Sequence, residues 1–187
     1  MILGVPVLVC LDLQQEFIAP GRPFADPDGE DVARLCADLI AQARRADWTL
    51  VHVQMHHGGP IIGGFGLTQP IKGCEPRPGE VLLRRAAVSA FAHPDLDGVL
   101  GSCMEANAYL IGFSAPMGLT TTLFDAEDRR VPLSLVEGAI GGADVGEWSA
   151  DETRALCCDT ARRLNRAVPL EHLQTTLEES SRVLAHG

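Results

Sequence analysis

Short apolar runs alternate along this chain with longer amphipathic segments. Residues 5–11 form a continuous apolar run, and residues 28–46 then place apolar side chains at helical spacing. A run that is apolar at every position is typical of a strand buried on both faces, and strands that alternate with helices are typical of parallel βα units. The pattern therefore predicts an α/β three-layer sandwich, with helices on both faces of a central, mostly parallel sheet.

The same alternation continues to the end of the chain. No internal repeat and no linker interrupts it, so we expect residues 1–187 to form a single domain. The loop 56–78 is rich in Gly and Pro and long for a connection in a compact domain, which is typical of the lid or wall of a site. Further strands are predicted at 49–54, 81–83, 108–113, 131–136 and 167–170, and further helices at 95–107, 117–128, 151–165 and from 171 onward.

The charge of the chain narrows the classes of partner. Its 15 basic and 25 acidic side chains give a formal charge of −10, which repels phosphate backbones and anionic membrane surfaces. No apolar run approaches membrane-spanning length, and the apolar start lacks the basic region and cleavage site of a signal peptide. We therefore expect a cytoplasmic protein that binds a small-molecule substrate, and neither nucleic acid nor a membrane.

The six cysteines are scattered along the chain without a CxxC spacing. Such spacing is typical of reduced, structural thiols in a cytoplasmic protein. Zinc ligands come in closely spaced pairs, so we expect no zinc site from these cysteines.

Asp12 directly follows the first predicted strand. In parallel sheets, ligands bind outside the carboxyl ends of the strands, where His56, Arg85 and the segment 114–118 are also expected. A carboxylate at the edge of an apolar core has a raised pKa, which prepares it to act as a general acid or base near neutral pH. The alternative is that Asp12 caps a helical turn or accepts hydrogen bonds from backbone amides.

Three blocks of the chain are spaced as in a known family. They are D-L-Q-Q-E-F at 12–17, P-G-E at 78–80 with S-A-F at 89–91, and the stretch 112–126. Together they resemble the isochorismatase-like hydrolases, the superfamily that includes nicotinamidases and N-carbamoylsarcosine amidases. The blocks are in order over nearly the whole chain. The resemblance implies the Rossmann-like fold of that family and a homo-oligomer, either a dimer or a tetramer.

The resemblance implies that the amidases of this family use an Asp, a Lys and a Cys in catalysis. This chain has other residue types at two of the three corresponding positions. The Asp corresponds to Asp12. The Lys, six residues before the Phe of S-A-F, corresponds to Arg85, and the Cys, six residues after Gly112, corresponds to Gly118. Without a thiol at position 118, no thioester forms there. The resemblance also assigns substrate binding to Phe17, His56, Ser114 and Thr122.

Some relatives carry a D-x-H metal motif after the second strand. Here Gln54 stands at the Asp position before His56 and His57, so the set of ligands is incomplete. We therefore expect no metal and no cofactor, with His56 lining the pocket as a neutral side chain. The backbone amides near Ser114 and Gly118 precede a predicted helix, a geometry that binds an anion or a developing oxyanion.

The resemblance leaves three functions open. True isochorismatases also look like this chain at Gly118, because they protonate a vinyl ether with the Asp and need no covalent step. Arg85 would favour the ionised form of Asp12 and so weaken Asp12 as a proton donor. Alternatively, its guanidinium could bind a substrate carboxylate with two parallel hydrogen bonds. The first function is therefore a cysteine-independent hydrolase of small carboxylated substrates, with Asp12 as general acid or base. The others are an inert binding or structural member of the family, with a structural salt bridge between Asp12 and Arg85, and an amidase whose nucleophile has moved to Cys74.

Overall fold

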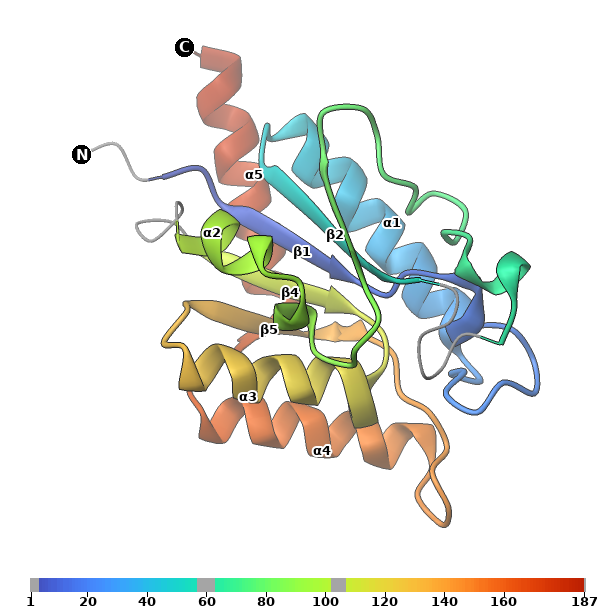
Figure 1. The fold of residues 1–187 in the computed structure, drawn as a ribbon. Coiled ribbons are helices and arrows are strands. Elements are labelled where there is room, and N and C mark those ends of the chain that lie inside the picture. Colours follow the sequence, from blue (N-terminus) through green and yellow to red (C-terminus); the bar gives the residue numbers. More distant parts are fainter. Residues whose placement is uncertain (1–3, 57–62, 102–106, 187) are drawn as a thin grey trace.

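The computed structural model describes residues 4–56, 63–101 and 107–186, and a six-stranded sheet forms its centre (Figure 1). All five strand pairs are parallel, which confirms the predicted α/β architecture. The order across the sheet is β3-β2-β1-β4-β5-β6. The strands are β1 (Val7–Leu11), β2 (Thr49–Met55), β3 (Val81–Arg85), β4 (Ala108–Gly112), β5 (Leu133–Ile140) and β6 (Ala167–Pro169).

Helices cover both faces of the sheet (Figure 1). One face carries α1 (Gly29–Arg45) and α5 (Leu170–His186), and the other carries α2 (Asp95–Gly101), α3 (Thr120–Asp128) and α4 (Ala150–Arg163). Each face buries its own cluster of apolar side chains. Burial on both faces explains why β1 is apolar at every position.

The sequence also sets where these helices begin and end. The first turn of α1 is acidic, and its last turn carries Arg44 and Arg45, an arrangement that suits the helix dipole. At the start of α4, Ser149 and Glu152 form a reciprocal capping box.

Several predicted elements have different bounds in the structure. The strand predicted to stop at Val136 continues to Ile140, because a register shift against β4 lets it pass Glu137 and Gly138, a pair typical of a strand end. The helix predicted from Met117 begins with a π-helical turn, η4 (Ala115–Leu119), before α3. Of the helix predicted at 95–107, α2 covers the first part, and residues 102–106 lie outside the described chain.

The strand order reverses between β1 and β4 at the centre of the sheet. β2 and β3 extend it to one side and β5 and β6 to the other, and such reversal points are where open parallel sheets bind ligands. Gly112 ends β4 with a φ of 119°, and a Cβ there would lie 2.0 Å from the carbonyl oxygen of Leu11. Glycine therefore permits the close approach of the two central strands at this end.

Glu80 joins the edge of the sheet to α1. Its carboxylate accepts hydrogen bonds from Arg44 Nε at 2.7 Å and Nη2 at 3.0 Å, and from the Arg77 backbone N–H at 2.8 Å. His52, buried in β2, lies with its Nε2 2.9 Å from the same carboxylate. Burial alone would raise the pKa of Glu80, but these partners outweigh burial and lower the pKa to about 2.

We expect Glu80→Gln to lower the free energy of unfolding by about 2–3 kcal/mol near neutral pH, because an amide cannot accept from all of these donors. The contribution of the ionised carboxylate is present above its ordinary pKa of 4.5 and is lost as the pH falls toward 2, so the difference between the two proteins should shrink in acid. Urea denaturation near neutral pH and in acid measures both effects. The exposed Glu147→Gln is the matched control, and an equal loss in both variants would contradict the role of Glu80.

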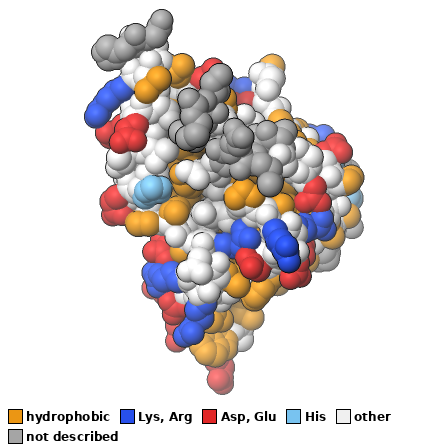
Figure 2. All heavy atoms as spheres, turned by 90° about the vertical axis from the view of Figure 1, so that its left-hand side faces the viewer, with side chains coloured by type: hydrophobic (Ala, Val, Ile, Leu, Met, Phe, Trp, Pro, Cys, Tyr) orange, Lys and Arg blue, Asp and Glu red, His pale blue; other side chains and the backbone are white. Residues whose placement is uncertain are grey.

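The amino ends of the strands lie on the left of the molecule in Figure 1, opposite the carboxyl ends where the strand order reverses. Acidic and basic side chains lie interspersed over that side (Figure 2). Within the described ranges, no helix is both long enough and apolar enough to cross a membrane.

Candidate functional site

Asp12 lies at the carboxyl end of β1, at the reversal point of the sheet. Its φ of 50° is a left-handed conformation, which a short polar side chain tolerates better than most. Its backbone N–H donates to the carbonyl oxygen of Val53 at 2.9 Å, and the residue is completely buried. The end of β1 therefore holds this carboxylate inside the protein and out of contact with bulk water.

Arg85, the last residue of β3, pairs with Asp12. Its Nη2 lies 2.7 Å from Asp12 Oδ2, and both side chains are buried. Asp12 Oδ1 and Arg85 Nε and Nη1 are also buried, and no described residue bonds to them. Buried polar atoms without a partner are rare and costly in native proteins, so this pair retains the capacity to bind a third group.

Burial outweighs the neighbouring charge in setting the pKa of Asp12. It raises the pKa from 3.8 to about 6, although the charge and the hydrogen bond of Arg85 act in the opposite direction. The guanidinium therefore lowers the pKa, as the sequence leads one to expect, but does not return it to the ordinary value. A carboxyl group with a pKa near 6 exchanges protons readily around neutral pH.

Gly118 lies in the π-helical turn η4 and faces Asp12. A Cβ at this position would lie 3.3 Å from Asp12 Oδ2 and 3.4 Å from Leu11 Cδ2. The fold thus brings together positions 12, 85 and 118, which are far apart in the sequence. Single π-helical turns occur frequently at functional sites. A side chain at position 118 would occupy the space beside the carboxylate, and glycine leaves that space without one.

Ser114 precedes this turn and is completely buried. Its carbonyl oxygen accepts hydrogen bonds from the backbone N–H groups of Met117 and Leu119, and the N–H of Ala115 donates to the carbonyl oxygen of Gly141 at 2.8 Å. Three N–H groups of this segment are therefore already engaged within the protein. The anion site predicted from the helix start has correspondingly fewer donors.

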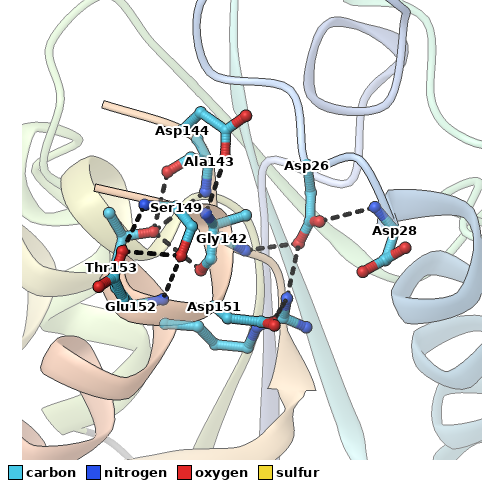
Figure 3. Close-up of polar contacts among 11 residues, drawn as sticks. Asp26, Asp28, Gly142, Ala143, Asp144, Ser149, Asp151, Glu152 and Thr153 are labelled. Atoms are coloured by element: carbon cyan, nitrogen blue, oxygen red, sulfur yellow. Dashed lines mark hydrogen bonds and ion pairs between the residues drawn. The ribbon is translucent and has the colours of Figure 1, made fainter. Parts of the chain in front are cut away.

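Asp26 is a buried carboxylate that the sequence reasoning did not single out (Figure 3). Its Oδ1 accepts from the Asp28 N–H at 2.9 Å and its Oδ2 from the Gly142 N–H at 2.6 Å, which ties the segment before α1 to the loop after β5. A Cβ at Gly141 would lie 2.1 Å from the ring of Phe113, so this loop packs directly on the end of β4. The available signal was an Asp three residues before the start of a helix, where its side chain can accept from the backbone N–H two residues further on.

Gln14 was noted in the sequence only as a letter of its motif. Its Nε2 donates to the carbonyl oxygens of Met55 at 2.8 Å and Thr68 at 2.9 Å, and its Oε1 accepts from the Met55 N–H at 2.9 Å. The buried amide thus holds the end of β2 against the short helix η2 (Phe65–Thr68). This residue fixes the backbone next to Asp12.

The other residues assigned to substrate binding lie in different surroundings. Phe17 is completely buried and stacks on Phe113, with ring centroids 6.2 Å apart. Thr122 is also buried, and its Oγ1 accepts from the Ala90 N–H at 3.0 Å, which joins α3 to the S-A-F segment. His56 is exposed at the end of β2. Packing and backbone contacts therefore account for the first two, and their assignment to substrate binding stays a prediction.

The described cysteines are poor nucleophiles. Burial raises the pKa of Cys74 to about 12, and it raises the pKa of Cys10 and of Cys36 well above the ordinary thiol value. A reactive thiolate at Cys74 is therefore disfavoured. His57 and Cys103 lie outside the described residues, and within those residues no group of three His, Cys, Asp or Glu side chains is placed to hold a metal ion.

Comparison with protein families gives one match. Residues 6–160, most of the chain, match the family model described as the isochorismatase domain. No curated protein matches the chain.

Solved structures with similar folds come from several bacteria. A cysteine hydrolase from Pseudomonas syringae pv. phaseolicola has a TM-score of 0.78 at 17% identity, with 94% of this chain and 93% of that chain covered. An isochorismatase family protein from Desulfovibrio vulgaris has a TM-score of 0.77 at 23% identity, covering 94% and 99%. An isochorismatase from Pseudomonas putida has a TM-score of 0.77 at 23% identity, covering 88% and 86%. At these identities the likeness is one of fold.

Proposed function

This chain belongs to the isochorismatase domain family, and from that premise we propose that it hydrolyses a small carboxylated substrate without a cysteine nucleophile. Asp12 acts as the general acid or base, and Arg85 holds the substrate carboxylate. Gly118 leaves the space beside Asp12 to the substrate. The function is thus an acid-base hydrolysis with no covalent intermediate on the protein.

One observation carries the proposal: Asp12 and Arg85 form a buried pair in which both partners keep unpaired polar atoms. A salt bridge with a purely structural role gains most when its remaining atoms are also bonded. The unpaired Nε and Nη1 of Arg85 can donate to a carboxylate, and Asp12 Oδ1 can carry the proton that is transferred. A pKa of about 6 for Asp12 supports transfer near neutral pH.

The chemistry balances for an enol ether. Asp12 in its acid form donates a proton to the terminal carbon of the C=C bond, and the positive charge that develops is shared with the ether oxygen. Water adds to the adjacent carbon, and the C–O bond to the leaving alcohol then breaks. One proton of the water returns to Asp12 and the other passes to the leaving oxygen, so the products are a ketone and an alcohol. The net change is the addition of one water molecule.

A second candidate is a binding or structural member of the family with an inert site. The hydrogen bond of 2.7 Å between Arg85 and Asp12 supports it, because a guanidinium bonded to the carboxylate opposes protonation of the acid. The two candidates differ in turnover, which the next experiment measures.

The test is incubation of the purified chain with isochorismate and a panel of related carboxylated enol ethers, with pyruvate followed by a coupled lactate dehydrogenase assay. Pyruvate released in proportion to protein concentration is the expected result. A rate equal to that of buffer with all members of the panel would remove the hydrolase proposal and leave the binding protein.

We expect the pH dependence of this turnover to follow the acid form of Asp12. Because the pKa is about 6, kcat for an enol ether should be constant well below that pH and fall about tenfold per unit well above it. A pH profile of kcat across that range is the measurement. A rate that does not change through pH 6 would contradict Asp12 as the proton donor, and a rate that rises through pH 6 would assign Asp12 to activation of water.

A further inference from the structure

A cavity of about 690 Å³ lies along the edge of the sheet, on the opposite face of β3 from Asp12. Arg84 and Arg85 are neighbours in this strand, and neighbouring residues of a strand point to opposite faces. Arg85 pairs with Asp12, whereas Arg84 lines the cavity. The volume is in the range of small-molecule sites. Asp12 and Arg85 do not line the cavity, whereas Gln14 and His56, which lie next to the candidate site, do.

Gln54 lines this cavity with its side-chain amide. The residue is 6% exposed, and its side chain makes no hydrogen bond to any described residue. Nearby buried polar side chains are satisfied: Gln14 bonds Met55 and Thr68, and His52 lies against Glu80. An amide with both donor and acceptor capacity therefore faces the cavity unused.

Arg84 supplies a positive charge beside this amide. Gln54 and Arg84 are direct partners in the register of β2 and β3, so their side chains lie next to each other on the same face. The guanidinium makes no ion pair with any residue in the described ranges. Its planar fork matches a carboxylate, to which it can donate two parallel hydrogen bonds.

The other residues that line the cavity determine which kind of anion fits it. Leu82, Pro70 and Pro76 provide apolar surface. The carboxylate of Glu75 also lines the cavity, and its negative charge disfavours ligands that carry more than one negative charge, such as phosphate esters. A singly charged acid with an apolar body fits this combination best.

We propose that this cavity is a second binding site, for small monocarboxylates that carry an amide group and an aliphatic body. Arg84 binds the carboxylate, Gln54 pairs with the amide of the ligand, and Leu82 contacts the aliphatic part. The site is independent of turnover at Asp12, so a ligand bound here is not the group that is hydrolysed there.

The test is a titration of the full chain with N-acetylleucine, followed by NMR or calorimetry, with the uncharged N-acetylleucinamide as the comparison ligand. We expect N-acetylleucine to bind and the amide to bind at least about tenfold more weakly, the effect of one charge-assisted contact. Arg84→Gln should weaken binding by a similar factor. Arg77→Gln removes an exposed charge from the neighbouring loop, outside the cavity, and should leave the affinity within about twofold.

Gln54→Leu provides a second, independent measurement. It should weaken binding of N-acetylleucine by about fivefold while leaving thermal stability about equal, because the substitution breaks no hydrogen bond to a described residue. A clear loss of stability would show a structural partner for the amide and would overturn its role. The proposal also fails if N-acetylleucine does not bind, if Arg84→Gln and Arg77→Gln weaken it equally, or if Asp12→Asn weakens it, which would place the ligand at the other site.

Discussion

Asp12→Asn is expected to reduce kcat by about 10²–10⁴-fold on any substrate that the chain turns over, the usual contribution of a positioned general acid or base. Asparagine has nearly the shape of aspartate and tolerates the same left-handed backbone at φ 50°. Its amide cannot transfer a proton as the carboxyl group does. The loss should therefore appear in kcat, with KM changed much less.

The control for this variant is Asp47→Asn. Asp47 also adopts a left-handed conformation, with φ 55°, but it lies in the connection before β2, at the opposite end of the sheet. Its replacement should leave kcat within about twofold. If Asp12→Asn retained activity within a few-fold of the wild type while folding normally, Asp12 would not be the proton-transfer group.

Arg85→Met is expected to lower the free energy of unfolding by about 3–5 kcal/mol at mildly alkaline pH, the usual cost of removing one partner of a buried ion pair. Methionine fills part of the same volume but leaves the Asp12 carboxylate buried without its partner. The folded-state pKa of Asp12 is raised from 3.8 to about 6, so burial of this group costs stability that is lost as the pH rises from about 4 to about 6 and stays lost above that. Without Arg85, the pKa rises further and that cost grows.

The destabilisation by Arg85→Met should therefore be large well above pH 6 and much smaller near pH 4 to 5, where Asp12 is protonated in the folded protein. Chemical denaturation at the two pH values measures this difference. Arg84→Met, one residue earlier on the same strand and exposed, is the matched control and should change stability by about 0.5 kcal/mol or less. A loss that is independent of pH would mean that the ion pair with Asp12 is not its origin.

Periodicity predicted the layers of this fold because the central strands β1, β2 and β4 are buried on both faces and the helices bury one face each. It did not predict the strand order, since the reversal between β1 and β4 depends on which loops cross the sheet and on contacts such as the approach of Leu11 to Gly112. The strand β5 was predicted too short for a related reason. Its continuation past Gly138 depends on a register shift against its neighbour, which local residue preferences do not contain.

The candidate site was accessible from the sequence in part. The position of Asp12 followed from a buried strand that ends in a carboxylate, and the resemblance supplied Arg85 and Gly118. The balance between burial and charge at Asp12 required three-dimensional distances, because Arg85 is 73 residues away. A residue that belongs to a family motif can contact a ligand or can serve packing, and the motif alone does not distinguish the two roles. Phe17 stacks in the core, and Thr122 accepts a hydrogen bond from the backbone of Ala90.

The backbone at position 118 also bears on which residue types this position can accept. The nearest atom to a Cβ at Gly118 is 3.3 Å away, so a Cβ there needs its neighbours to shift by only a few tenths of an ångström. Codons for glycine and cysteine differ by a single nucleotide, and so do codons for arginine and lysine. A single nucleotide change can therefore replace Gly118 by cysteine, whose Cβ this backbone accepts with a small shift of its neighbours.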